Sequence, residues 1–316
     1  MLAIVAPGQG AQTPGFLAPW LEVAAAAELL RRADDVTGLD LVRLGSSGDA
    51  EEIRDTAVAQ PLLVAVALAS AAALDLLPAE GAASDAAEDR LFAGHSIGEL
   101  TAAVLAGALP ADAALVLARE RGRAMAEACA AADTGMTAVL GGDPLEVDAA
   151  LDLHGLVAAN RNGAGQVVAA GPRAGLLALA ADPPAKARLR PLDVAGAFHT
   201  EAMRPAQQAL AEVVAGLDPH DPAGHLLSNA DGAVVRSGTD LLERLVAQVA
   251  APVRWDSCMA TMAGSGVAAV LELAPGGTLT GLAKRALKGV DTVALRGPGD
   301  LDAARLLLKR AGEGTS

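Results

Sequence analysis

The chain has 316 residues, of which 52% are hydrophobic and 20% are charged. This composition allows a large buried core and excludes a disordered or fibrous chain. The formal net charge of −14 argues against nucleic acid or an anionic membrane as the main partner, because both attract a basic surface. Aromatic residues make up only 2% of the chain, so the core must consist of small aliphatic side chains, which favours an α/β fold over a β-sandwich.

The N-terminus reads as a first strand over Leu2–Ala6 rather than as a signal peptide, because it has no basic region and is soon interrupted by Pro7. No later apolar run is long enough to span a membrane before Gly, Pro or a charge breaks it. Cys129 and Cys258 lie far apart and belong to no metal-type pair, so we expect reduced, buried thiols and no metal site. These features predict a cytoplasmic protein.

Helix and strand patterns alternate along the first part of the chain. We expect a helix over Ala65–Leu77, an acidic loop of small residues over Ala79–Arg90 and a strand over Leu91–Ala93. That strand leads into the sequence GHSIGEL and an apolar helix that ends near Gly107. A further helix is expected over Ala111–Ala131. Such alternation is typical of an α/β domain.

The stretch from Thr137 to Ala197 has a different pattern. Its order is strand, helix, strand, strand, helix, strand, with the two central strands joined by a turn at Asn162-Gly163. This order is typical of a ferredoxin-like unit. We therefore predict a large α/β domain over residues 1–131 and 198–316, with a ferredoxin-like small subdomain over residues 132–197 inserted into it.

A G-x-S-x-G sequence, residues 94–98, lies between a predicted strand and a predicted helix. In that context Ser96 occupies a tight turn with its hydroxyl beside the positive end of the helix, where an anion is stabilised. The alternative is a turn whose serine only caps the helix. The strand before Ser96 and the helix after it favour the nucleophile.

Two other segments suit a serine nucleophile. The glycine-rich loop Pro7–Gln12 matches neither standard phosphate-binding motif, so it fits better as the source of an amide for an oxyanion hole. His199 follows the predicted insert directly, where the returning chain can supply the base that Ser96 needs. A histidine satisfied in the core is the alternative. The other histidines outside the serine motif fit surface or structural roles: His154, His220 and His225.

Three arginines fall on the helix predicted over Ala111–Ala131: Arg119, Arg121 and Arg123. A spacing of two residues places neighbours on different faces of a helix, so one or two of them at most can face a cleft. An arginine that faces inward must meet an anion, since a buried and unpaired guanidinium is very costly.

Several segments, in order along nearly the whole chain, resemble malonyl-CoA:acyl carrier protein transacylases and the related acyltransferase domains of polyketide synthases. They are GQGAQ, GHSIGEL, ERGRAM, GAFH, QVAAPVRW and ELAPGGTLTGL. The resemblance implies a hydrolase-like acyltransferase domain that moves a malonyl group from malonyl-CoA to the phosphopantetheine thiol of an acyl carrier protein, for fatty acid or polyketide synthesis. Malonyl-CoA is then a substrate, no cofactor is implied, and we expect a monomer.

The resemblance also implies the roles of individual residues. Ser96 matches the family nucleophile and His199 matches its base. The backbone amides of Gln12 and Ile97 match the oxyanion hole. The main-chain carbonyl of Gln248 matches the group that orients the histidine, so no acidic third member of a triad is expected.

Selectivity for malonyl is implied by two further matches. Arg121 matches the guanidinium that pairs with the malonyl carboxylate, and Phe198 belongs to the GAFH segment typical of malonyl-selective members. Gly196 departs from the histidine often found in polyketide versions, which leaves the pathway open.

Two other functions stay open from the sequence. A serine esterase or thioesterase of the α/β-hydrolase type also uses G-x-S-x-G, and Asp193 could complete its triad. The chain could also be a non-catalytic module that docks carrier proteins. A basic C-terminal region is either a solvated helix face or a docking patch for an acidic partner; its basic residues are Lys284, Arg285, Lys288, Arg296, Arg305, Lys309 and Arg310.

Overall fold

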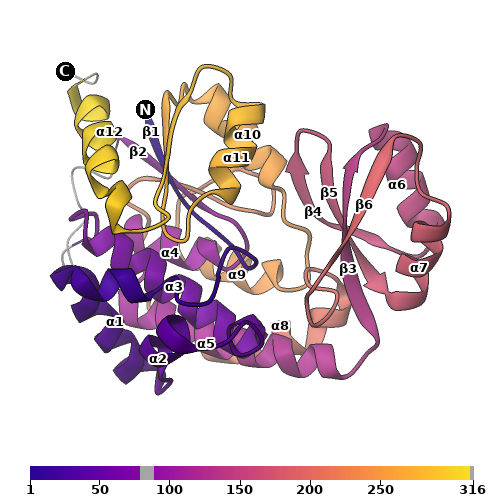
Figure 1. Ribbon diagram of the computed structural model, residues 1–316, viewed down its shortest axis with the longest axis horizontal. Coiled ribbons are helices and arrows are strands. Elements are labelled where there is room, and N and C mark those ends of the chain that lie inside the picture. The colour runs from indigo at the N-terminus through magenta and orange to yellow at the C-terminus, as the bar shows by residue number, and fades with distance from the viewer. Residues whose placement is uncertain (79–88, 314–316) are drawn as a thin grey trace.

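The protein is a mixed α/β structure with two separate sheets (Figure 1). It was obtained as a computed structural model, which describes residues 1–78 and 89–313. Of the acidic loop predicted over Ala79–Arg90, residues 79–88 lie outside the described residues. One sheet has six strands in the order β10-β9-β1-β2-β7-β8, and the other has four in the order β4-β5-β3-β6.

The six-stranded sheet is built around β1, which pairs in parallel with β2 and β9. Its strands are β1 (Leu2–Ala6), β2 (Arg90–Gly94), β7 (His225–Leu227), β8 (Val234–Val235), β9 (Ala269–Glu272) and β10 (Asp291–Ala294). All five residues of β1 are buried, as expected for a parallel strand covered on both faces. The carboxyl ends of β1 and β2 meet at one edge, where His95 N donates to Ala6 O. Ligands of open α/β sheets bind outside such an edge.

Helices cover both faces of this sheet (Figure 1). They are α1 (Ala24–Thr37), α2 (Leu41–Ser47), α3 (Thr56–Ala72), α4 (Gly98–Leu105), α5 (Ala111–Ala130), α8 (Arg204–Val214), α9 (Gly238–Gln248), α10 (Trp255–Gly264), α11 (Thr278–Ala286) and α12 (Leu301–Glu313). Short 3-10 turns add η1 (Ala18–Glu22), η2 (Glu52–Arg54), η4 (Glu201–Met203) and η5 (Pro298–Asp300). The helix expected over Ala111–Ala131 is thus present as α5.

The bounds predicted for the helix over Ala65–Leu77 were wrong, because α3 runs over Thr56–Ala72. It begins earlier because the Asp55 side chain caps its first turn by accepting from Ala57 N at 2.9 Å. It ends earlier because Asp75 adopts a positive φ of 55° in the turn that follows. Almost every position of α3 is buried, so no polar stripe marked its ends.

The four-stranded sheet follows α5 in the chain, and all its pairs are antiparallel. Its elements are β3 (Thr134–Gly141), α6 (Pro144–Leu153), β4 (Val157–Gly163), β5 (Gln166–Pro172), α7 (Arg173–Ala181) and β6 (Ala187–Leu192). Its helices bury a small core of their own against it, which includes Val139, Leu151 and Leu179. The strand, helix, strand, strand, helix, strand order expected for this stretch is the one observed.

This sheet meets the rest of the molecule along β4, which packs beside α10. Arg161 N donates to Val253 O, and Val253 N donates to Ala159 O, both at 2.9 Å.

Among the described residues, no helix is long and apolar enough to cross a membrane.

Candidate active site

Ser96 lies on a sharp turn between β2 and α4, at the carboxyl edge of the six-stranded sheet. Its φ of 53° is a left-handed value that costs a non-glycine residue energy, as in a nucleophile elbow. The flanking glycines allow this turn. A Cβ on Gly94 would lie 1.9 Å from the Gly98 carbonyl carbon, and a Cβ on Gly98 would lie 2.3 Å from Ala6 O. The turn therefore needs glycine at both positions.

The Ser96 hydroxyl is paired with His199. Ser96 Oγ lies 2.7 Å from His199 Nε2, and His199 Nδ1 lies 2.8 Å from the main-chain oxygen of Gln248. A carbonyl can only accept, so the proton of neutral His199 is on Nδ1 and Nε2 faces the hydroxyl as an acceptor. Burial, with a smaller contribution from the charge of Arg121, lowers the His199 pKa to about 3. The ring is therefore neutral and able to take a proton at neutral pH.

Arg121 is the one inward-facing member of the three arginines on α5. Its side chain is buried, and its Nη2 donates to Ser96 Oγ at 3.1 Å and to Gln248 Oε1 at 3.0 Å. Burial lowers its pKa to about 10, so the guanidinium stays charged at neutral pH. Arg119 and Arg123 instead form exposed or half-exposed ion pairs with Glu120.

Polar side chains that the sequence did not single out lie under the turn. Asn229 Oδ1 accepts from Ser96 N at 2.7 Å, while Asn229 Nδ2 donates to Gly94 O at 2.8 Å. Glu99 accepts from Asn229 N and from Gln248 Nε2. Asn229 has no local motif that could have revealed it. Glu99 had a signal, because it is the one charged residue in the otherwise uncharged segment GELTAAVL.

The loop after β1 approaches the turn through Gly8, where an added Cβ would lie 2.8 Å from His95 O. Gln9 Oε1 accepts from Gln60 Nε2 at 3.3 Å, and Gln60 Oε1 accepts from Arg121 Nη1 at 2.6 Å. The side chain of Gln12 is turned elsewhere: it accepts from Gly10 N at 2.9 Å and donates to Ile53 O at 3.3 Å. The predicted role of Gln12 concerns its backbone amide, which these contacts do not test.

Ile97 and Phe198 flank the reacting pair. No acceptor for the Ile97 amide is found among the described residues, which leaves that amide available to a ligand. Ile97, Ser96 and Arg121 line a cavity of ≈ 10 Å³, about the space of one water. Phe198 is buried in the hydrophobic core and does not line this cavity.

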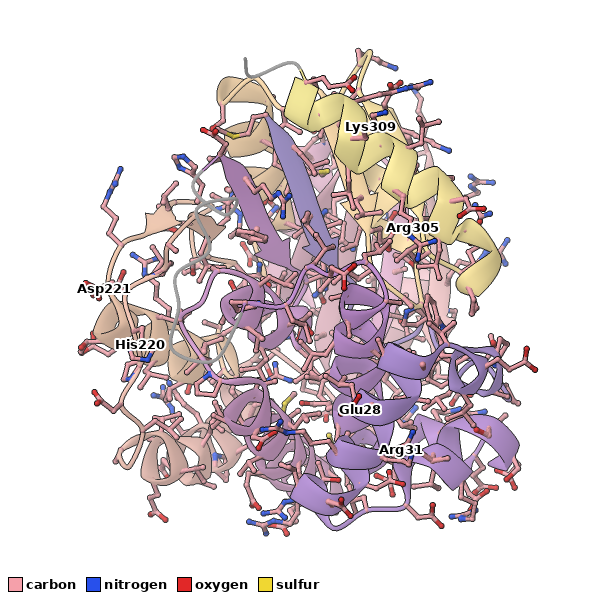
Figure 2. The ribbon with its side chains drawn as sticks, turned by 90° about the vertical axis from the view of Figure 1, so that its left-hand side faces the viewer. Glu28, Arg31, His220, Asp221, Arg305 and Lys309 are labelled. Carbon is pink, nitrogen blue, oxygen red and sulfur yellow. The ribbon has the colours of Figure 1, made fainter. Side chains whose placement is uncertain are left out.

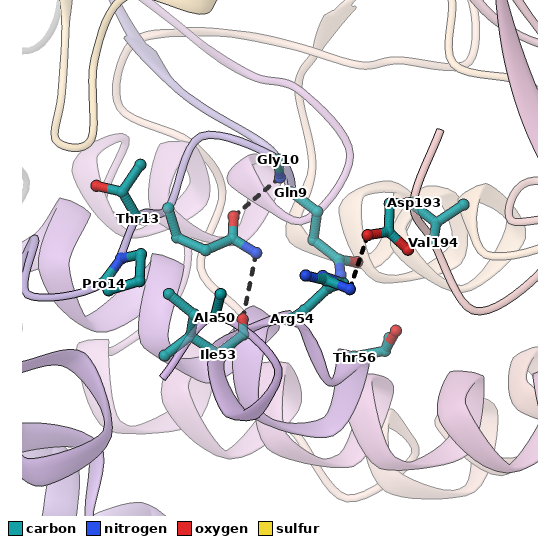
Figure 3. A pocket seen from close by; sticks show the side chains of 11 residues that line it. Gln9, Gly10, Thr13, Pro14, Ala50, Ile53, Arg54, Thr56, Asp193 and Val194 are labelled. Atoms are coloured by element: carbon teal, nitrogen blue, oxygen red, sulfur yellow. Dashed lines mark hydrogen bonds and ion pairs between the residues drawn. The ribbon is translucent and has the colours of Figure 1, made fainter. Parts of the chain in front are cut away.

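A larger cavity, of ≈ 240 Å³, lies beside the loop after β1 (Figure 3). Its walls come from that loop, from the stretch that runs through η2 to the start of α3, and from the segment after β6. Across it, Arg54 Nη1 and Asp193 Oδ2 form an ion pair at 2.7 Å. The carboxylate of Asp193 is therefore paired with Arg54, and the partner of His199 Nδ1 is the main-chain oxygen of Gln248. The suggestion that Asp193 completes a catalytic triad is therefore wrong.

The cysteines are free and buried, as expected, and burial raises the pKa of both thiols, to about 11 for Cys129. Neither is a nucleophile at neutral pH. Within residues 1–78 and 89–313, no group of three or more His, Cys, Asp or Glu side chains could hold a metal ion.

The family model for the acyl transferase domain matches residues 4–303. The chain belongs to the acyl transferase domain family. It is 50% identical over 302 residues to the malonyl CoA-acyl carrier protein transacylase of Mycobacterium tuberculosis, covering 96% of this chain and 98% of that one. Among solved structures, the MCAT of Mycobacterium tuberculosis superposes with a TM-score of 0.90 at 49% identity, covering 96% of this acyltransferase and 99% of that chain.

A second solved structure shows a relative with its partner. It is described as a type II PKS acyl-carrier protein in complex with its malonyl-transacylase, and it matches with a TM-score of 0.88 at 32% identity. The match covers 96% of this acyltransferase and 99% of that chain. The mixed α/β architecture of the sequence prediction is therefore the architecture of known malonyl transacylases.

Proposed function

We propose that this acyltransferase moves a malonyl group from malonyl-CoA to the phosphopantetheine thiol of an acyl carrier protein, through an ester on Ser96. One observation carries the proposal: the Arg121 guanidinium lies 3.1 Å from the hydroxyl of Ser96 and is buried. A buried cation beside a nucleophile calls for an acyl group with its own anion. Malonyl has a carboxylate two bonds from its thioester carbon, whereas acetyl has none.

Acylation begins with malonyl-CoA bound so that its carboxylate meets Arg121 in place of the Ser96 hydroxyl. His199 Nε2 takes the Ser96 proton as the oxygen attacks the thioester carbon, and Gln248 O holds the imidazolium through Nδ1–H. The tetrahedral intermediate collapses, the C–S bond breaks, and the CoA sulfur leaves with the proton returned from His199. The thiol of the carrier protein then attacks the malonyl ester, and the same steps in reverse free Ser96.

The oxyanion of each intermediate needs amide donors. We assign one to Ile97 N–H, which follows the nucleophile and begins α4. The second comes from the loop Pro7–Gln12. The resemblance points to Gln12, but the hydrogen bonds from Gln9 through Gln60 to Arg121 favour Gln9. None of these steps uses a cofactor.

The two rival functions fit the site less well. A hydrolase of the triad type has no acid for His199, since Asp193 pairs with Arg54, and it gives no use for a buried Arg121. A module that only docks carrier proteins gives no reason for a strained Ser96 at 2.7 Å from a neutral histidine.

We also propose that residues 132–197 form a ferredoxin-like subdomain inserted into a hydrolase-like domain of residues 1–131 and 198–316. The strand order β4-β5-β3-β6, with both crossover helices in the segment, supports the subdomain. The Arg54–Asp193 ion pair and the 2.9 Å contact between His95 Nε2 and Asn162 Oδ1 would then join the two units. Phe198, at the return to the large domain, would shape the acyl pocket only by holding His199 in place.

Substitution of Arg121 tests the proposed function. We expect Arg121→Ala to lower kcat/KM for malonyl transfer by an amount that corresponds to roughly 2–4 kcal/mol of transition-state stabilisation, because a charge-assisted contact to a desolvated carboxylate is lost. Acetyl transfer should hold steady or rise. Arg121→Lys should restore part of the loss, since an ammonium cannot make two parallel hydrogen bonds to one carboxylate.

The measurement is kcat/KM with malonyl-CoA and acetyl-CoA for the wild type and both variants. Arg123→Ala is the matched control, since Arg123 lies on the same helix but is exposed, and its ratio should equal the wild-type ratio. An identical malonyl-to-acetyl ratio in all four proteins would show that Arg121 does not read the carboxylate.

The basic region at the end of α11 is expected to help dock the acidic carrier protein. Lys284, Arg285 and Lys288 are exposed there, and Arg285 Nη2 reaches Gln166 Oε1 of the four-stranded sheet at 3.5 Å. Reversing these charges to Glu should raise the KM for carrier protein and weaken its salt dependence, while self-acylation by malonyl-CoA is unchanged.

A charge reversal of Lys309, labelled in Figure 2, is the control. It lies on α12, at the far edge of the molecule from the four-stranded sheet (Figure 1). If both half-reactions are impaired equally by the α11 variant, the region does not dock the carrier protein.

A further inference from the structure

Glu99 is a buried acid directly under the reacting groups, and the steps above do not use it. It lies in the first turn of α4, after Ser96, and is 3% exposed. The charged and titratable groups whose fields reach it are Arg121, Arg244 and Asp231, together with the Cys258 thiol. Arg244 is already paired with Asp231 and Asp240 near the surface, so Arg121 is the buried cation whose charge acts on Glu99. Burial raises the pKa of Glu99 to about 8, while the bond from Asn229 N–H and the charge of Arg121 act in the opposite direction.

The side-chain amide of Gln248 lies between these two buried groups. Gln248 Nε2 donates to Glu99 Oε2, while Gln248 Oε1 accepts from Arg121 Nη2 at 3.0 Å. The amide nitrogen thus faces the acid and the amide oxygen faces the cation. Each end of the amide dipole faces a group of the opposite polarity, so this orientation is favoured electrostatically. The flipped amide would place its N–H groups against the guanidinium.

We propose that Glu99 is a positioning residue that acts through the Gln248 amide to hold Arg121 where it reads the malonyl carboxylate. The inference rests on the proposed function. Glu99 anchors the amide, the amide oxygen holds one guanidinium nitrogen, and Gln60 holds the other at 2.6 Å. Arg121 is thereby fixed at both Nη atoms and meets the incoming carboxylate in one geometry, which a bidentate contact requires.

The proposal predicts an effect on substrate choice and not only on stability. In Glu99→Gln the new side chain keeps its size but presents an NH2 group to one of two partners, Asn229 N–H or Gln248 Nε2, that both donate. In either orientation two donors face each other, which displaces the side chain from its bonds, so the Gln248 amide is no longer held in place and Arg121 loses a fixed contact. We expect the malonyl-to-acetyl ratio of kcat/KM to fall about tenfold, which is the upper end of the usual contribution of one hydrogen bond.

Glu272→Gln is the matched control. Glu272 is also fully buried and also binds main-chain amides, those of Gly277, Leu279 and Thr280, at 2.8–2.9 Å. Loss of the Glu272 carboxylate should lower the free energy of unfolding and leave the malonyl-to-acetyl ratio of kcat/KM unchanged. An equal change of ratio in both variants would mean that Glu99 has only a general structural role, and the proposal would be overturned.

A double-mutant cycle with Arg121→Ala tests the path of the effect. If Glu99 acts on selectivity through Arg121, then Glu99→Gln should not change the ratio further when Arg121 is absent. Gln248→Met, which keeps the main-chain carbonyl and fills a similar volume, should lower the ratio as Glu99→Gln does. It also serves if Glu99→Gln does not fold, because a wild-type ratio in Gln248→Met would overturn the proposal.

Failure of the proposed function gives a different result. In that case Arg121→Ala itself leaves the ratio unchanged, or the wild type forms no malonyl adduct. If Arg121→Ala lowers the ratio and Glu99→Gln does not, the function stands and the role of Glu99 is refuted.

Discussion

Ser96→Ala is expected to abolish both the covalent malonyl adduct and transfer to the carrier protein. Within the described part of the chain, Ser96 is the one hydroxyl bonded to a neutral histidine and a buried guanidinium together. Both cysteines are held as thiols by burial, so neither can replace it. Alanine accepts a positive φ no better and no worse than serine does, so the turn should be kept.

The measurement is intact mass after brief exposure to malonyl-CoA, followed by addition of holo-carrier protein. Ser70→Ala is the control: Ser70 is a buried serine on α3 that bonds Ala67 O and Ala274 N, and its loss should leave the adduct intact. A malonyl adduct on the Ser96→Ala protein would place the nucleophile elsewhere.

Ser96 could be predicted from the sequence because its signal is local. Ser96 lies in a turn that has no room for a Cβ at Gly94 or Gly98. The two required glycines and the serine between them form a motif that can be recognised in the sequence. His199 and Arg121 are single residues with no such motif of their own. His199 became a candidate from its position directly after the predicted insert, and the resemblance then chose Arg121 from the three arginines of its helix. The structure brings both within 3.1 Å of Ser96 Oγ.

The supporting shell could not be predicted in the same way. The side chains of Asn229 and Gln248 reach Ser96 and Glu99 from more than a hundred residues away along the chain, and nothing near them in the sequence specifies those partners. The resemblance implied only a main-chain role for Gln248. Gln60 lies on α3, which is apolar on nearly every side, so no polar face of the helix marked it as a site residue. Such contacts follow from how β2, α4 and α9 pack together, which local periodicity does not encode. The cavity of ≈ 240 Å³ beside the loop after β1 also forms from segments that are distant in the chain, so the sequence does not predict it.

His199→Ala is expected to slow acylation by about a hundredfold to ten-thousandfold, the usual worth of a positioned general base. Arg121 and the amides remain in this variant, so malonyl-CoA should still bind. Acylation measured by stopped flow, with His220→Ala as the control, checks this. His220 lies in an exposed connection and is drawn at the surface in Figure 2. Unchanged acylation at neutral pH would remove His199 from the mechanism.

The pH dependence of the wild type follows from the same histidine. Its pKa is lowered to about 3 by burial and by the charge of Arg121, so it stays neutral as the pH falls through the ordinary histidine range. The kcat/KM of acylation should therefore be nearly flat from about pH 7 to about pH 5, where an exposed histidine base would lose activity with a midpoint near its ordinary pKa of about 6.5. In His199→Ala the rate should instead rise with pH, because hydroxide must take the Ser96 proton. A wild-type profile with a midpoint near 6.5 would mean that His199 is solvated in the working enzyme and that its burial beside Arg121 does not set its proton affinity.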